Sequence, residues 1–189
     1  MKRAMLPQVR LRRHRPGDMG WVVQRHGELY WREFGYDARF EALVAGIVAR
    51  FIEHLDARRE RCWVAARGDL RLGAVFLVKK APGVAQLRLL IVEPAARGLG
   101  LGKKLVRACI RFARAARYRK LVLWTQSELA AARGLYEAEG FRLVRREAHE
   151  SFGKPLEGEY WELPLRPARA SHRSRRRAPR RVPGRSPRR

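Results

Sequence analysis

Cysteine is scarce in this 189-residue chain, which contains only two. Two cysteines cannot form a disulfide framework, and they occur in no Cys-x-x-Cys pair or metal-ligand spacing. Long apolar runs are also missing: the longest, such as 73–78, are strand-sized, whereas a membrane span needs about 18 residues. The first residues show no apolar segment typical of a secretory signal. These absences set aside a disulfide mini-protein, a zinc module and a membrane protein, and favour a cytoplasmic, metal-free protein.

Acidic residues are also few relative to basic ones. The chain has 43 Lys and Arg against 18 Asp and Glu, a net charge of +25. Residues 166–189 alone contain 11 arginines, four prolines and no acid, and residues 1–15 contain six basic residues and no acid. The composition predicts a basic N-terminal extension at 1–8, one folded domain at 9–165 and a disordered Arg-rich tail at 166–189.

Two interpretations of the tail stay open. It is either an arm that binds nucleic acid or another polyanion weakly, with salt-dependent affinity, or a solvated extension without a partner. A nucleic-acid-binding protein would also need a basic face with interleaved aromatic residues on the body. Residues 16–165 carry only a modest net charge of +8, which does not establish such a face.

Apolar residues make up 46% of the chain, which is enough for a core. Their periodicity predicts four helices, at about 18–34, 38–55, 102–116 and 128–139. It also predicts seven strands, at about 9–13, 62–66, 72–79, 84–92, 121–125, 141–146 and 159–165. Asp18 and Asp37 stand where helix N-caps are expected. The order of elements indicates a single α/β domain with a mixed, mostly antiparallel twisted sheet and one β-α-β crossover.

The most informative segment is Leu89–Leu105, which combines a predicted strand, a glycine-rich turn and a helix. Glycines allow close backbone approach, and free N–H groups at a helix start attract phosphate. A P-loop is excluded, since Arg97 stands where its first glycine belongs and Lys104 where its Ser or Thr belongs. The Gly-x-Gly-x-Gly spacing also fails the dinucleotide fingerprint.

The spacing that fits is Arg-x-x-Gly-x-Gly, formed by Arg97, Gly100 and Gly102. Here the chain resembles the GNAT acetyltransferase superfamily, whose corresponding loop binds the pyrophosphate of acetyl-CoA through backbone N–H groups. The resemblance implies a GNAT-like fold over 9–165 and acetyl-CoA as cosubstrate. The cofactor-binding residues that it implies are Leu90, Ile91, Val92, Arg97, Gly98, Leu99, Gly100, Leu101, Gly102, Lys103 and Arg133.

A second motif supports the resemblance. The segment Ala131–Phe141 looks like the family's helix that ends in Leu-Tyr-Glu-x-x-Gly-Phe. By resemblance, Tyr136 returns a proton to the departing CoA thiolate; the alternative is an ordinary half-buried helix tyrosine. The chain departs from the family at Leu129, seven residues before the tyrosine, where many members carry an Asn that contacts the CoA arm. That contact is therefore in doubt.

The N-terminal part narrows the resemblance. The segments His14–Val23 and Arg25–Tyr30 look like the acetyltransferase half of two-domain MarR–GNAT proteins. Those proteins place a winged-helix DNA-binding domain ahead of the acetyltransferase. Because only about ten residues precede the domain here, we expect the MarR part to be absent.

The expected reaction is attack of an amine on the acetyl thioester, which requires a base and an oxyanion donor. Candidate bases are Glu28, Glu33, Glu93 and His26, each with a structural alternative. The backbone N–H near Ile91 and Val92 is the expected oxyanion donor. Aromatic residues at 21–36 suggest an acceptor with an apolar body, although they equally suit a core.

Two further features of the sequence are given no catalytic role. Cys62 and Cys109 are predicted to be core thiols. His149 and Ser151 resemble part of a catalytic triad only by composition, and no nucleophile elbow accompanies them.

The leading hypothesis is an acetyl-CoA-dependent N-acetyltransferase that acts on an amine of a small molecule or a protein. One alternative is a catalytically silent CoA-binding sensor, and the other is a basic nucleic-acid-associated protein that acts through its tail. Dimerisation is common in the superfamily, so a homodimer is a further expectation from the resemblance alone.

Overall fold

A computed structural model describes residues 8–165, so the expectations for residues 1–7 and for the Arg-rich tail lie outside the described residues. Its four α-helices are α1 (Asp18–Phe34), α2 (Ala38–Glu53), α3 (Leu101–Ala115) and α4 (Ala130–Ala138). Its seven strands are β1 (Arg10–Arg13), β2 (Arg61–Arg67), β3 (Leu70–Ala81), β4 (Val84–Val92), β5 (Lys120–Gln126), β6 (Arg142–Ser151) and β7 (Lys154–Pro164). None of the described helices is long and apolar enough to cross a membrane.

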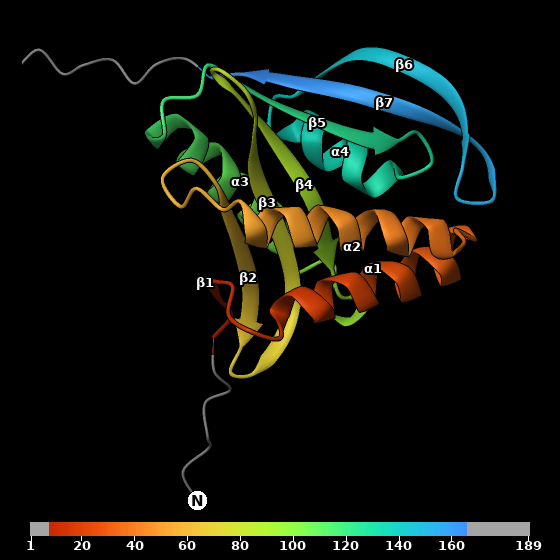
Figure 1. Ribbon diagram of the computed structural model, residues 1–189, viewed down its shortest axis with the longest axis horizontal. Helices are drawn as coiled ribbons and strands as arrows, with labels where there is room; N and C mark the ends of the chain where they lie inside the picture. The colour runs from red at the N-terminus through yellow and green to blue at the C-terminus, as the bar shows by residue number, and fades with distance from the viewer. Residues whose placement is uncertain (1–7, 166–189) are drawn as a thin grey trace, which may run out of the picture.

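The strands form one sheet in the order β1-β2-β3-β4-β5-β7-β6. Only the pair β4 and β5 is parallel, and α3 makes the crossover between them. Helices α1 and α2 cover one face of the sheet and α3 and α4 the other (Figure 1). The predicted fold class, element order and crossover are confirmed.

Strand β3 shows why the sheet is buried on both sides. Its residues from Leu72 to Leu77 are all buried, because alternate side chains point to opposite faces. Val75 and Leu77 pack with α3, whereas Ala74 and Phe76 pack with α1 and α2. Cys62 and Cys109 are both buried as expected, and burial raises the pKa of each thiol.

The expected cap at Asp18 is wrong, although the cap at Asp37 is confirmed by its bond to the Arg39 N–H. Gly17 occupies the N-cap position, and the fully buried Asp18 carboxylate accepts from Arg12, Arg71 and the Arg15 N–H instead. Burial opposes its ionisation, but these donors outweigh that cost and hold the pKa of Asp18 well below its usual range. Two guanidiniums bind a carboxylate more strongly than backbone N–H groups do.

The last two strands are much longer than predicted. They were expected over 141–146 and 159–165, yet they extend to Ser151 and begin at Lys154. A tight turn at Phe152 and Gly153, both with positive φ, joins them. Most of β6 is exposed, so residues 147–158 show little of the apolar alternation on which strand prediction depends. The turn of this long hairpin reaches the junction of α1 and α2, where the Phe152 carbonyl accepts from the Asp37 N–H, and it contributes residues to the site.

Candidate functional site

The site lies where β4 and β5 separate. The two strands pair only from Val84 to Gln86 and from Lys120 to Val122, although both continue beyond that point. The pairing of β4 with β3 also shifts by one residue between Arg88 and Ile91. Leu89 within this bulge has a φ of 52°, which is unusual for a residue other than glycine. Two cavities lie along the opening.

The first cavity, here called the glycine-loop cavity, has a volume of about 630 Å³. Its walls come from the end of α1, the end of β4, the glycine-rich turn and the start of α4. Nine of the eleven predicted cofactor-binding residues line it: Leu90, Ile91, Val92, Arg97, Gly98, Gly100, Leu101, Gly102 and Lys103. These nine residues therefore lie together along one cavity, and their binding of a cofactor stays a prediction.

Glycine is favoured at two positions of this wall for different geometric reasons. Gly100 is the N-cap of α3 and has a φ of 70°, a conformation that strains any residue with a side chain. At Gly102, an added Cβ would lie 3.1 Å from Leu135 on α4. Together they leave the first N–H groups of α3 open to the cavity, where Arg97 and Lys103 add positive charge. This arrangement suits a pyrophosphate.

Two predicted cofactor residues lie elsewhere. Leu99 is 54% exposed and does not line the cavity. Arg133 donates through Nε to Glu159 Oε2 at 2.9 Å, and Glu159 is completely buried. Arg133 therefore neutralises a buried carboxylate on β7 and secures α4, and it lines neither cavity.

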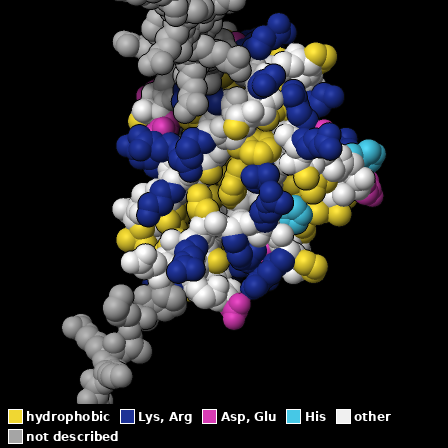
Figure 2. Space-filling view, turned by 90° about the vertical axis from the view of Figure 1, so that its left-hand side faces the viewer, with side chains coloured by type: hydrophobic (Ala, Val, Ile, Leu, Met, Phe, Trp, Pro, Cys, Tyr) yellow, Lys and Arg dark blue, Asp and Glu magenta, His cyan; other side chains and the backbone are white. Residues whose placement is uncertain are grey.

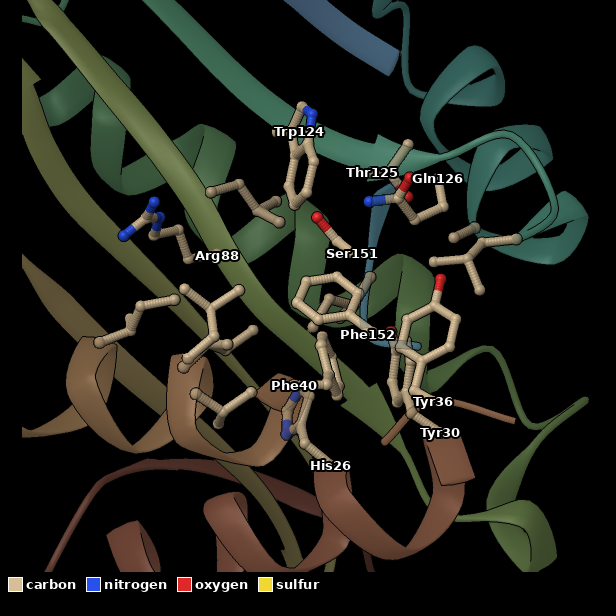
Figure 3. A pocket seen from close by; sticks show the side chains of 18 of the residues that line it. His26, Tyr30, Tyr36, Phe40, Arg88, Trp124, Thr125, Gln126, Ser151 and Phe152 are labelled. Atoms are coloured by element: carbon tan, nitrogen blue, oxygen red, sulfur yellow. The ribbon is translucent and has the colours of Figure 1, made fainter. Parts of the chain in front are cut away.

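The second cavity, here called the aromatic cavity, has a volume of about 420 Å³. Figure 3 shows β5 side chains on one side of it and α1 and α2 side chains on the other. Phe152, from the β6–β7 turn, lies between them, with its ring centroid 5.2 Å from that of Tyr36. Tyr36 is 2% exposed, and its buried hydroxyl lies near the Glu128 carboxylate. The cavity thus offers an apolar surface with a buried polar group.

The two cavities share walls, because Tyr30, Leu90, Leu129 and Ala132 line both. Tyr136 lies one helical turn after Ala132 and lines the aromatic cavity. Only 5% of Tyr136 is exposed, and burial raises the pKa of its phenol above the usual 10. The phenol is protonated at neutral pH and is therefore a proton donor close to the shared walls.

Neither predicted catalytic carboxylate lines a cavity. Glu93 accepts two hydrogen bonds of 2.7 Å from Arg25, and the same guanidinium pairs with Glu28. Glu33 does line the glycine-loop cavity, but it pairs with Arg97 at 2.7 Å. The candidate acids on α1 and after β4 are thus engaged by arginines.

His26, the remaining candidate base, lines the aromatic cavity and is almost completely buried. Its Nδ1 lies 2.8 Å from the Val22 carbonyl oxygen, so Nδ1 carries the hydrogen. Burial lowers the pKa of His26 to about 4, against an ordinary value of 6.5. The imidazole is neutral at pH 7 and a weak base.

The structure connects two residues that the sequence analysis set aside. His149 Nδ1 lies 2.9 Å from Ser151 Oγ, and His149 Nε2 lies 3.1 Å from Gln126 Oε1. A carbonyl oxygen only accepts, so Nε2 carries the hydrogen and Nδ1 accepts from the Ser151 hydroxyl. Ser151 and Gln126 both line the aromatic cavity. The spacing of His149 and Ser151 by two residues was the only sequence signal for their contact. The contact of His149 with Gln126 depends on the tertiary arrangement of the sheet.

Solved structures share this fold at low sequence identity. The yncA putative acetyltransferase from Salmonella typhimurium, solved with its cofactor acetyl-CoA, has a TM-score of 0.68 and 19% identity, covering 84% of this chain and 94% of that one. Ribosomal-protein-alanine N-acetyltransferase from Brucella melitensis has a TM-score of 0.69 and 20% identity, with coverage of 82% and 99%.

Sequence comparisons identify the family. "Probable N-acetyltransferase family 8 member 5" of Mus musculus is 42% identical over 85 residues, which cover 42% of this chain and 37% of that protein. The match therefore spans little more than a third of that relative. The family model described as "Acetyltransferase (GNAT) family" matches residues 19–141, from α1 through α4. The chain belongs to the GNAT acetyltransferase family.

Proposed function

We propose that this protein is an acetyl-CoA-dependent N-acetyltransferase whose acceptor amine binds in the aromatic cavity. The observation that carries the proposal is the meeting of the two cavities beside Tyr136. One cavity suits a pyrophosphate and a pantetheine arm, and the other suits a small apolar molecule. The kinship with the acetyltransferase half of MarR–GNAT proteins is also a proposal, and it rests on the N-terminal residue pattern alone.

The residues of the glycine-loop cavity fit acetyl-CoA. The free N–H groups at the start of α3 would hold its pyrophosphate, and the charge would be balanced by Lys103 and by Arg97, which would exchange Glu33 for the ligand. Leu129 and Ala132 would contact the arm that leads toward the shared walls. Bound there, acetyl-CoA supplies an activated acetyl thioester. Backbone N–H groups near Ile91 and Val92 would stabilise the developing oxyanion.

The chain's own residues account for both proton transfers. The Ser151 hydroxyl can accept a hydrogen of the incoming amine while it donates its own to His149 Nδ1. Tyr136 then donates its phenolic proton to the leaving thiolate. In this scheme Glu93 and Glu28 fix Arg25 between α1 and β4 and do not touch the amine.

The two alternative functions receive less support. A silent CoA-binding sensor has no need of the protonated Tyr136 phenol, which lines the aromatic cavity one helical turn from the shared walls. For a nucleic-acid-binding protein, one face does show many Lys and Arg side chains around a hydrophobic area (Figure 2). However, Arg61 and Arg59 already lie over the rings of Phe112 and Tyr118, each 4.3 Å from the ring centroid. The aromatic groups that would stack on bases are thus partly covered.

Calorimetric titration of the full chain with acetyl-CoA tests the proposal. We expect micromolar binding that Gly100→Glu abolishes, because a carboxylate would occupy the pyrophosphate position. Gly100→Ala introduces the same backbone strain without the charge, and Gly46→Glu adds the charge on an exposed part of α2. If the parent chain binds no acetyl-CoA, the proposed function is wrong.

A further inference from the structure

Arg88 is an arginine without an ionic partner at the edge of the aromatic cavity. It lies on β4, just before the bulge, and its side chain is partly buried. None of the ion pairs or side-chain hydrogen bonds among residues 8–165 involves it, in contrast to Arg25, Arg97 and Arg133. Burial lowers the pKa of Arg88, and the nearby positive charge of Arg50 lowers it further. Its position is therefore electrostatically unfavourable, and an anion would relieve it.

The other titratable residues of the aromatic cavity also favour an anionic ligand. Arg88 is the only Lys or Arg among the described residues that line the aromatic cavity, and no Asp or Glu lines it. His26 is neutral at pH 7. A polyamine or a lysine-rich peptide would find no unpaired carboxylate here to balance its additional charges, because Glu128, the acid beside Tyr36, is bound to Lys154. The cavity instead suits an apolar body that ends in a negative group.

The position of Arg88 also constrains the shape of the ligand. Figure 3 shows Arg88 at the opposite side of the cavity from Tyr30 and Tyr36. Tyr30 belongs to the walls that the two cavities share, where the amine would meet the thioester. Leu90, which belongs to the same walls, follows Arg88 by two residues across the bulge at Leu89. A ligand that reaches both ends must carry its amine and its negative group at opposite ends of its body, unlike an α-amino acid, whose carboxylate is adjacent to its amine.

We propose that the acceptor amine carries a carboxylate at the far end of an apolar, preferably aromatic, body, and that Arg88 binds this carboxylate. The inference rests on the proposed transferase function and names its substrate class. The apolar body lies among Phe40, Phe152 and Trp124, and the amine points toward the shared walls. The guanidinium can bind a carboxylate through two parallel hydrogen bonds.

A matched pair of small amines tests the inference. 4-(Aminomethyl)benzoate has the amine and the carboxylate at opposite ends of a ring, and 4-(aminomethyl)benzamide has the same shape without the charge. We expect kcat/KM for the benzoate to exceed that for the benzamide by at least about tenfold. Spermidine, which carries only positive charges, should be a poorer acceptor than either.

Variants of Arg88 locate the effect. In Arg88→Gln the preference for the benzoate should disappear, because the KM for the benzoate rises to that for the benzamide. Arg88→Lys should retain part of the preference, and Arg58→Gln, at an exposed loop arginine, should retain all of it. The Tm of Arg88→Gln should equal or exceed that of the parent, because the substitution removes an unpaired, partly buried charge that faces Arg50.

Direct binding separates failure of this inference from failure of the proposed function. Each amine is titrated calorimetrically into the full chain with and without saturating CoA. If the chain binds acetyl-CoA and acetylates the benzamide but neither binds nor acetylates the benzoate, the inference is overturned and the transferase function stands. Equal use of the two amines, a preference for spermidine, or an unchanged preference in Arg88→Gln overturns it as well. Absence of acetyl-CoA binding contradicts the proposed function instead.

Discussion

The Arg25 guanidinium holds the Glu93 carboxylate through two hydrogen bonds, with Nε and Nη2 each 2.7 Å from a carboxylate oxygen. Both side chains are largely buried, and the pair joins α1 to the end of β4. Glu93 lines neither cavity, so its carboxylate is not placed to meet an amine there. We therefore assign Glu93 a positioning role in the proposed function.

Replacement of Glu93 by Gln tests that role. The variant should lose about 1–2 kcal/mol of unfolding free energy, because a charge-assisted pair becomes a neutral hydrogen bond. Its kcat/KM should stay within about threefold of the parent value. Chemical denaturation and steady-state kinetics measure the two effects. A hundredfold loss of kcat in a variant of normal stability would instead identify Glu93 as the base.

Replacement of Tyr136 by Phe should produce the opposite pattern. The phenol makes no hydrogen bond in residues 8–165, so the variant should unfold like the parent and bind acetyl-CoA with unchanged Kd. Loss of the proton donor should lower kcat by about a hundredfold. Tyr30→Phe, at the shared walls, is the matched control. Normal kcat in Tyr136→Phe would exclude the role in proton return.

Leu129 offers a gain-of-function test. It lines both cavities and is the N-cap of α4, where its side chain caps nothing. Leu129→Asn should stabilise the fold by about 1 kcal/mol through an N-cap hydrogen bond. It should also tighten acetyl-CoA binding by about fivefold through a contact to the CoA arm. Leu129→Ala removes the leucine without adding an amide, and equal affinities of these two variants would refute the second effect.

Ser151 and His149 should act as one unit. Each of Ser151→Ala and His149→Gln should lower kcat/KM by at least about tenfold, because the amine loses its path for proton removal. The double variant should be no worse than the poorer single variant, since both substitutions interrupt the same chain. His54→Gln, at an exposed histidine outside the cavities, should have no effect. Additive losses would show that the two residues act independently.

His26 makes stability depend on pH. The unfolded chain binds a proton at His26 near pH 6.5, whereas burial keeps the folded pKa at about 4. The stabilisation is thus complete above pH 6.5 and is lost as the pH falls toward 4, by about 3 kcal/mol in total. His26→Phe, which keeps a ring against Tyr30, should flatten this part of the profile. Urea unfolding at several pH values measures the slope, and an unchanged slope in the variant would contradict the assignment.

Local sequence was sufficient for elements whose formation depends on neighbouring residues. The apolar periodicity and the flanking glycines predicted a helix at about 18–34, where α1 lies, and the residues of the glycine spacing at 98–102 lie along one cavity wall at the start of α3. Both rest on short-range rules, namely the helical repeat and the backbone freedom of glycine. Ion pairs are different, because the tertiary fold determines which charged side chains lie close together. Asp18 therefore looked like a cap and proved to be a buried partner of Arg12 and Arg71.

The sequence by itself determined the family, the mostly antiparallel sheet and the glycine loop, since motif spacing and hydrophobic periodicity are properties of the chain. Only the tertiary structure decided which polar groups face the aromatic cavity. Arg88 comes from β4, Gln126 from β5 and Ser151 from the end of β6. Their placement around one cavity depends on the separation of β4 from β5 and on a hairpin whose β6 strand is mostly exposed and carries little apolar pattern. Strand pairing over such separations is set by packing of the whole sheet, and no local sequence signal specifies it.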